Sequence, residues 1–405
     1  MHHTSTDSPT TAEQDRPASS KAVPSLLRRV NARRVLDILL ARGACTRSEL
    51  SRLTGISAPT ISKLIEQIAQ AGLIEEEPDL RTTAGRPSKV FHLADQSVRV
   101  LGVVVDIRQC TILSTGLSAV VEDKWIRRFP TPQNYDVLID RLADEINALS
   151  AAHPAPCLGV GLSIPGLIDR RKGQVVFSPN LHFTDGQFPQ RDLQAKIGLE
   201  TVMIQEEHAL CLAEKTYGAA QGIPDFAIID ISSGLGMGVV SGGRYIEGHC
   251  GFGGELGHIP VQTDGPLCGC GRRGCLETLA SDTAVARELS TILKRQVEID
   301  ELVELSKSHA YLVLPVLEQA IDHLATGIGI VISIFNPSQV ILFGRMFDAN
   351  PHLFERLKTR VAERTLAPSA LECDLVRAHG NKEMGALAGI ISHLFHALGP
   401  RVQSP

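Results

Sequence analysis

No stretch of this 405-residue chain comes near the eighteen or so uninterrupted apolar residues that a membrane-spanning helix needs. The beginning of the chain also lacks the charged segment and following apolar run of a secretory signal. We therefore expect a soluble, cytoplasmic protein. Six of the nine cysteines are scattered without pairing logic, which indicates a reducing compartment: Cys45, Cys110, Cys157, Cys211, Cys250 and Cys373.

Charge is unevenly distributed along the chain. Residues 21–95 contain 12 Lys and Arg against 8 Asp and Glu, a net charge of +4, whereas the whole chain carries −5, which leaves −9 for the remainder. A modestly basic N-terminal module joined to an acidic body is typical of a nucleic-acid reader coupled to a sensor or an enzyme. A chain of this length is expected to form two or three domains.

The first hundred residues predict a helix-turn-helix after a disordered tail. Residues 1–22 are polar and cannot bury enough surface to order themselves, and residues 23–95 form the expected module. Thr46-Arg-Ser-Glu49 is a capping box that starts a helix, and Thr54-Gly55 ends it. Ser57 then caps a second helix, whose buried face follows helical spacing: Ile61, Leu64, Ile65 and Ile68.

The exposed start of that second helix suits the major groove of DNA. Two short strands, expected at 73–80 and 90–93, enclose a basic loop typical of a wing. Gly85 and Pro87 extend the backbone around Arg86, whose guanidinium suits a narrow minor groove. These features favour a winged helix that binds DNA, with a protein-docking helical hairpin as the alternative. The predicted groove contacts are small, polar or basic: Ser57, Pro59, Thr60, Ser62 and Lys63.

From Val100 onward, apolar runs rich in β-branched residues alternate with helical stretches. Buried strands are expected at 100–106, 158–164, 226–231 and 340–343. Helices are expected near 135–150, 207–217, 284–294 and 312–335. Such alternation predicts an α/β body, and at this length two lobes with a cleft that binds a small molecule.

Four side chains of metal-ligand type are gathered within eighteen residues, with glycines between them: His258, Cys268, Cys270 and Cys275. A tetrahedral zinc ion needs four such donors about 2 Å from one point, and the glycines let the turn fold back. The spacing therefore predicts a zinc site. Because four protein donors leave no open position for a catalytic water, the site is expected to be structural. The alternative is three inert thiols beside a surface histidine.

Three motifs of this chain resemble motifs of the ROK family, which comprises sugar kinases and sugar-responsive repressors. They are Gly253-Gly-Glu255-Leu-Gly-His258 running into the segment from Cys268 to Glu277, Gly161-Leu-Ser-Ile-Pro165-Gly166, and Ser178-Pro-Asn180-Leu181. The resemblance covers residues 97–395. The module ahead of it is similar to that of the transcriptional repressor branch, which includes the xylose, glucose-responsive and N-acetylglucosamine repressors.

The resemblance implies an actin-like, ribonuclease-H-type body at 97–398. One lobe would comprise 97–220 with a returning C-terminal helix at 384–398, and the other 221–383. It also implies a pocket that holds sugar hydroxyls, which suits carboxylates because each can accept from two adjacent hydroxyls. A histidine that also binds zinc would be locked in orientation, so the metal would preorganise the pocket. The implied sugar ligands are Asn180, Glu207, Glu255, His258 and Glu277, with solvated loop carboxylates as the alternative for Glu255 and Glu277.

Two positions depart from the pattern of the family's kinases. The kinases carry an Asn-Asp pair whose aspartate is the base, whereas this chain reads Gln205-Glu206-Glu207-His208. Glu207 therefore stands in the base position, and its extra methylene shifts the carboxylate by roughly an ångström from where an aspartate would place it. The glycine-rich first phosphate loop is replaced by Asp106-Ile-Arg108-Gln109-Cys110, whose side chains fill phosphate volume. The second loop, 232–238, keeps its glycines but is also explained as a tight turn. We therefore expect neither ATP binding nor catalysis.

The sequence thus predicts a sugar-responsive transcriptional repressor rather than an enzyme. Its partners would be an operator in double-stranded DNA and a sugar or sugar phosphate, which would close the cleft, change the wing geometry and release the DNA. Because one winged helix buries little surface, a homodimer or homotetramer is expected. The alternatives are an ATP-dependent sugar kinase, including a bifunctional one, and an interaction scaffold that merely keeps the sugar-binding fold.

Overall fold

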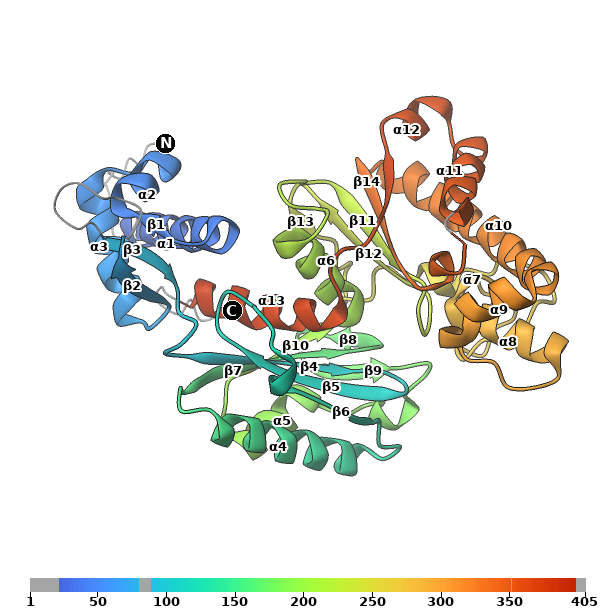
Figure 1. Cartoon of the computed structure of the whole chain (residues 1–405), viewed down its shortest axis with the longest axis horizontal. Helices are drawn as coiled ribbons and strands as arrows, with labels where there is room; N and C mark the ends of the chain where they lie inside the picture. The colour runs from blue at the N-terminus through green and yellow to red at the C-terminus, as the bar shows by residue number, and fades with distance from the viewer. Residues whose placement is uncertain (1–21, 80–88, 351, 398–405) are drawn as a thin grey trace, which may run out of the picture.

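The N-terminal module is a winged helix. The computed structural model describes residues 22–79, 89–350 and 352–397, so the predicted wing loop with Arg86 and nearly all of the expected tail lie outside the described residues. Three helices, α1 (Ala22–Arg42), α2 (Arg47–Thr54) and α3 (Ala58–Gln70), pack beside a small antiparallel sheet (Figure 1). The sheet has the strand order β1 (Cys45–Thr46), β3 (Lys89–Leu93), β2 (Ile74–Pro78). The two strands expected beside the wing are therefore present and paired.

Local signals fix the helix ends in this module. Thr46 Oγ1 accepts the backbone N–H of Glu49, and the Glu49 carboxylate accepts that of Thr46, so the predicted capping box is formed. Gly55 ends α2 at a φ of 69°, a conformation that glycine adopts without strain. Ser57 occupies the N-cap position of α3, but its hydroxyl shares a hydrogen bond with the Thr60 hydroxyl instead of accepting a backbone N–H. The predicted side-chain cap at Ser57 is therefore wrong.

The first lobe is built on a five-stranded sheet of order β10-β7-β4-β5-β6. Strands β4, β7 and β10 run parallel, and β5 and β6 are antiparallel to their neighbours. Helices α4 (Tyr135–Ala152) and α5 (Pro189–Ile197) cover one face, and α6 (Glu206–Tyr217) and α13 (Lys382–His396) the other (Figure 1). The strands of this lobe, with its small hairpin, are β4 (Arg99–Val105), β5 (Gln109–Thr115), β6 (Ile126–Pro130), β7 (Cys157–Ile164), β8 (Leu167–Asp169), β9 (Gln174–Phe177) and β10 (Thr201–Gln205).

The second lobe repeats this plan with the strand order β13-β12-β11-β14-β15. Its strands are β11 (Phe226–Asp230), β12 (Gly236–Ser241), β13 (Arg244–Tyr245), β14 (Gln339–Phe343) and β15 (Asp374–Arg377). Its helices are α7 (Glu277–Ala280), α8 (Asp282–Leu293), α9 (Leu302–Ser308), α10 (Ala310–Phe335), α11 (His352–Arg364) and α12 (Ala367–Leu371). Its core lies between the sheet and α10.

The long strands and helices expected in the body are all present, with ends that differ by at most two residues. The glycine-rich segment 232–238 turns β11 into antiparallel β12, so its explanation as a tight turn between packed strands is confirmed. The last helix, expected from Met384, begins at Lys382, and Leu398 lies outside the described residues.

Helix α10 is the one described helix that is long and apolar enough to cross a membrane by length and composition. However, 56% of its apolar window is buried inside the protein. Its inward residues Leu317, Leu324 and Ile328 belong to the core of the second lobe. Packing therefore explains its composition, since the central helix of a large core is apolar on most sides.

Helix α13 lies directly on the first sheet because glycines in the sheet leave room for it. A Cβ at Gly161 of β7 would collide with the backbone carbonyl of Ala386, and a Cβ at Gly102 of β4 would lie 3.1 Å from Leu387 Cγ. The helix therefore approaches the strands more closely than side chains would permit.

We predict that Gly161→Ala lowers the free energy of unfolding by about 2 kcal/mol, because the new methyl group must displace the backbone of α13. Gly329→Ala is the matched control. Gly329 lies within helix α10, and a Cβ there would meet its nearest neighbour at an ordinary 3.5 Å, so this change should stabilise by about 0.5–1 kcal/mol. Urea unfolding measures both, and equal effects would contradict the close approach.

Candidate functional site

The cleft between the lobes brings the predicted sugar ligands together. It lies where three strands end, because Asp106 follows β4, Gln205 ends β10 and Asp230 ends β11. Its cavity is about 60 Å³, well below the ~300 Å³ of common ligand pockets, so a pyranose would fit only if the lobes moved apart, which is the opposite of the expected closure of the cleft. All five predicted sugar ligands line this cavity: Asn180, Glu207, Glu255, His258 and Glu277.

The turn between β11 and β12 positions two of these carboxylates. Glu277, the first residue of α7, accepts the backbone N–H of Leu235 at 3.1 Å. A Cβ at Gly236 would collide with the Glu207 carboxylate, and one at Gly234 would lie 2.7 Å from Glu277 Oε2. The glycines of this turn therefore leave space for the acidic side chains of the pocket.

Burial makes two of the pocket acids unusually weak. It raises the pKa of Glu207 to about 7, reinforced by the charge of Glu255. Burial and the charge of Glu277 likewise raise the pKa of Glu255 to about 7. Glu207 Oε2 is buried and has no hydrogen-bond partner among the described residues. Near neutral pH both carboxyls can therefore accept a hydrogen bond from a ligand hydroxyl or donate one to it.

The four predicted metal ligands converge on one point. The donor atoms of His258, Cys268, Cys270 and Cys275 all lie within 4.8 Å of one another. Cys270 Sγ is 3.7 Å from Cys275 Sγ, and Cys268 Sγ is 3.4 Å from His258 Nδ1. Two thiolates on one tetrahedral ion lie ~3.8 Å apart. The side chains present therefore fit a single four-coordinate metal ion.

His258 joins this cluster to the pocket. Its Nδ1 faces Cys268, whereas its Nε2 lies 3.7 Å from Glu255 Oε2. Cys268 Sγ also lies 3.6 Å from Glu277 Oε1. A metal ion on Nδ1 would fix the imidazole and leave Nε2 as an N–H donor toward the pocket. The His-Cys cluster and the pocket therefore share a wall.

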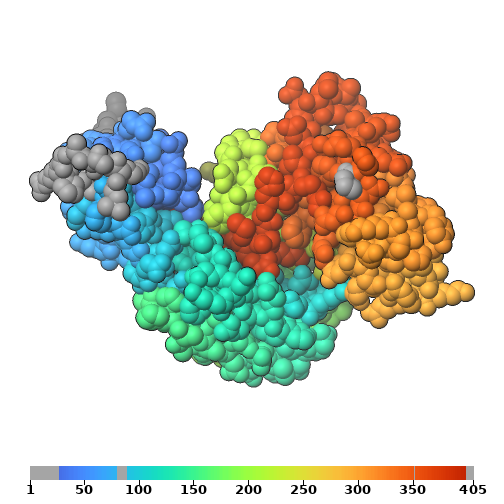
Figure 2. Space-filling model, viewed as in Figure 1, coloured from blue at the N-terminus to red at the C-terminus, as the bar shows by residue number. Residues whose placement is uncertain are grey.

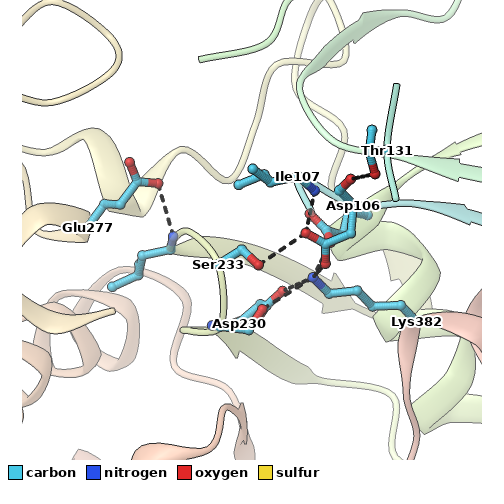
Figure 3. A network of polar contacts seen from close by, with 10 residues as sticks. Asp106, Ile107, Thr131, Asp230, Ser233, Glu277 and Lys382 are labelled. Atoms are coloured by element: carbon cyan, nitrogen blue, oxygen red, sulfur yellow. Dashed lines mark hydrogen bonds and ion pairs between the residues drawn. The ribbon is translucent and has the colours of Figure 1, made fainter. Parts of the chain in front are cut away.

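A buried lysine, which reasoning from the sequence missed, lies beside the pocket (Figure 3). Lys382 is 6% exposed. Its Nζ lies 3.1 Å from Asp106 Oδ2 and 3.2 Å from Asp230 Oδ2, and it also contacts Glu206. Although burial alone would lower it, these three carboxylates hold the pKa of Lys382 well above its usual value. The lysine is therefore a permanent cation between the lobes.

No pattern near Lys382 reveals this role. The residue stands in the first turn of an apolar helix capped by Asn381, a place where lysine is ordinarily solvated. Its partners come from three segments that are distant in the chain, so the cluster exists only once both sheets have formed. The one available signal was that Asp106, Glu206 and Asp230 each stand at or just after the end of a buried strand.

A second cavity, of about 390 Å³, lies on the other side of Lys382. Arg108 and Gln109, which replace the expected glycines of the phosphate loop, both line it. Arg108 forms an ion pair with Glu298 of the second lobe, and Arg345 forms one with Asp300. The second cavity is therefore bordered by both positively and negatively charged side chains of the protein.

The predicted DNA contacts lie at the start of α3. Ser57, Pro59 and Lys63 are exposed, and Thr60 and Ser62 are half-buried. The winged helix protrudes to one side of the two lobes (Figure 2). The role of these residues in DNA binding stays a prediction.

A winged helix joined to two like α/β lobes, with an acidic pocket and a His-Cys cluster in the cleft, defines a DNA-reading module fused to an actin-like sugar-kinase fold. The ROK family model matches residues 110–393, and the chain therefore belongs to the ROK family. A MarR family model matches residues 28–81, which contain most of α1 and all of α2, α3 and β2. The predicted family and fold class are thus confirmed.

The curated relatives it resembles are regulators. The xylose repressor of Bacillus subtilis (strain 168) is 26% identical over 343 residues, which cover 84% of this chain and 88% of the relative. The DNA-binding transcriptional dual regulator NagC of Escherichia coli (strain K12) is 24% identical over 367 residues, covering 87% and 89%.

Two solved structures share this architecture in whole or in part. A ROK family transcriptional regulator described as a homolog of the E. coli MLC protein has a TM-score of 0.78 at 25% identity, covering 92% of this chain and 98% of that one. A ROK glucokinase from Streptomyces griseus, in complex with glucose and AMPPNP, has a TM-score of 0.64 at 21% identity and covers 72% and 97%. The second likeness concerns the fold of the body alone.

We predict that Cys275→Ser abolishes stoichiometric metal binding, because only three of the four donors remain. Elemental analysis of the purified protein should find one metal ion per chain before the change and a small fraction afterwards. Cys373→Ser is the control, since this thiol lies outside the cluster. Equal metal contents in the two variants would contradict the site.

Proposed function

We propose that this protein is a sugar-responsive transcriptional repressor. The observation that carries the proposal is the fusion of a MarR-type winged helix to a ROK body. The cleft of that body brings Glu207 together with one amide, one imidazole and two carboxyl side chains: Asn180, His258, Glu255 and Glu277. The names of the relatives, xylose repressor and NagC among them, support it. Such a protein would work in the cytoplasm, where the DNA and the sugar meet.

The DNA-binding part would be residues 23–95. Its α3 would enter the major groove with Ser57, Pro59, Thr60, Ser62 and Lys63, and Arg86 would reach the minor groove. Paired half-sites multiply specificity, so the working form would be a homodimer or homotetramer. Residues 97–398 would form the sensor, with lobes 97–220 plus 384–398 and 221–383.

The sensor would hold a sugar or sugar phosphate between its lobes. Glu207 and Glu255, with pKa values raised to about 7, supply both donor and acceptor oxygens for neighbouring hydroxyls. Asn180, Glu277 and His258 Nε2 would complete the set. The His-Cys cluster would hold zinc, whose chemistry here is to fix the imidazole and the loop, because four protein ligands exclude a catalytic water.

The same residues argue against a kinase. The base of the family's kinases is an aspartate, whereas Glu207 in that position has one methylene more, which moves its carboxylate by roughly an ångström, and a general base must lie within hydrogen-bond reach of its proton. Arg108 occupies the first phosphate loop and pairs with Glu298. We therefore propose that the cleft binds without transferring phosphate, and sugar-dependent ATP turnover on a panel of sugars would refute this.

We predict that the full-length protein enriches an inverted repeat from a random DNA pool at physiological salt. Lys63→Ala should weaken binding to every duplex and reduce the slope of log affinity against log salt by about 1, because one phosphate contact is lost. Lys358→Ala, on α11 of the second lobe, is the control. Recovery of unenriched DNA would contradict the repressor proposal.

We also predict that at least one sugar from a panel of pentoses, hexoses, amino sugars and their phosphates raises the melting temperature. Glu255→Ala should weaken its binding at least about tenfold, because hydrogen bonds to a charged or strongly polarised group contribute about 1.5–3 kcal/mol. Glu288→Ala, an exposed acid of α8, is the control. A panel without any shift would favour the interaction scaffold.

A further inference from the structure

One helix connects the ligand cleft to the winged helix. Helix α13 begins at Lys382, in the carboxylate cluster between the two cavities, and its 15 residues extend roughly 22 Å to His396. At that far end Arg33 of α1 donates to the Ser392 carbonyl at 3.1 Å and lies 3.1 Å from His396 Nδ1. The Arg33 guanidinium also stacks over the Phe395 ring. The same element therefore contacts the site and the DNA-binding module (Figure 1).

Close packing makes α13 move together with the helix that carries the pocket acids. Helix α6 begins with Glu206 and Glu207. A Cβ at Gly385 would collide with the backbone carbonyl of Ala209 in α6, and a Cβ at Gly389 would collide with the Ile204 side chain of β10. Elements in backbone contact cannot slide past one another without a clash. Helices α6 and α13 are therefore one rigid unit.

Lys382 ties this unit to the second lobe. Its ammonium contacts Asp106 and Glu206 of the first lobe and, at 3.2 Å each, Asp230 Oδ2 and Ser232 Oγ of the second. Because Lys382 is buried, water screens these contacts little. Three carboxylates facing one ammonium would repel one another if the cation were removed.

The other ion pairs between the lobes are weaker. The side chains of Arg108 and Glu298 are 60% and 37% exposed, and those of Arg170 and Glu247 are 35% and 43% exposed, so solvent screens both pairs.

Ser233 of the second lobe also donates a hydrogen bond to Asp106 of the first at 3.1 Å (Figure 3). This bond belongs to the same cluster, because Asp106 is one of the carboxylates that Lys382 contacts. Among the described residues, Lys382 thus makes the buried ion pairs between the lobes. Glu214 of α6 adds a second buried link, because its carboxylate accepts the backbone N–H groups of His379 and Gly380 at 2.8 and 2.6 Å.

We propose that Lys382 is an interlobe latch that sets the angle of the lobes without ligand and passes a change of that angle through α13 to α1. A ligand that widens the small cavity would displace Asp230 from Lys382, pivot the lobes about the close contact of α6 with Gly238 of β12 and shift the contact of α13 with Arg33. The proposal rests on the proposed function for the nature of the ligand and of the DNA, whereas the latch itself concerns only this chain.

The test compares full-length wild type with Lys382→Met, which keeps the length of the side chain and removes its charge. The melting temperature should fall by about 10 °C, because three buried carboxylates lose their counter-ion. Amide hydrogen exchange should become at least about tenfold faster in α6 and α13 and also in residues 27–42 of α1, at the other end of α13 from the change.

A second variant keeps the test informative if Lys382→Met does not fold. Asp230→Asn removes the carboxylate that the second lobe contributes and leaves Lys382 paired with Asp106 and Glu206. Because the remaining carboxylates keep their counter-ion, we expect this variant to fold. It should produce the same exchange pattern with a smaller fall in melting temperature. Lys196→Met is the control, because it removes an exposed lysine paired with Asp140.

Two results would overturn the latch. One is a melting temperature of Lys382→Met equal to that of wild type. The other is faster exchange around the cluster in both variants while α1 exchanges as in wild type, which would mean that the lysine only stabilises the first lobe. Neither readout uses DNA or sugar, so a failed DNA selection would refute the repressor proposal and leave this test unaffected.

Discussion

Three carboxylates, Asp106, Glu206 and Asp230, meet at one buried point between the lobes, and the Lys382 ammonium makes that meeting possible. Taking such groups out of water is unfavourable unless each finds an opposite charge at hydrogen-bond distance. The ends of β4, β10 and β11 can therefore approach one another only with this cation between them. The pocket, the second cavity and the base of α13 are all arranged around it.

On the opposite wall, the pocket borders the metal cluster. His258 presents one ring nitrogen to Cys268 and the other to Glu255, so the geometry of the ligands and that of the pocket are set together. The cleft of this fold thus has the His-Cys cluster on one side and an internal ion cluster on the other. In this arrangement Glu206 is paired with Lys382, whereas Glu207, the next residue, lines the pocket with Glu255 and Glu277.

Features encoded by neighbouring residues were predictable from the sequence. The capping box at Thr46, the buried stripe of α3 and the four metal ligands each depend on short spacings, so their patterns survive without knowledge of the fold. The five pocket residues came from the resemblance to the ROK family, because they stand on four separate segments. Lys382 could not be found in either way, since its burial and its partners arise from tertiary packing. Ser57 shows the same limit on a smaller scale, because its hydroxyl had a nearby alternative partner in Thr60.

The central claim is that ligand in the cleft controls DNA binding at the other end of α13. Its most direct test is the dissociation constant for the enriched duplex, measured at fixed salt with and without a saturating amount of a sugar that stabilises the protein. DNA binding should be at least about tenfold weaker with the sugar, a coupling free energy of about 1.4 kcal/mol. An unchanged dissociation constant, with sugar binding verified in the same sample, would contradict it.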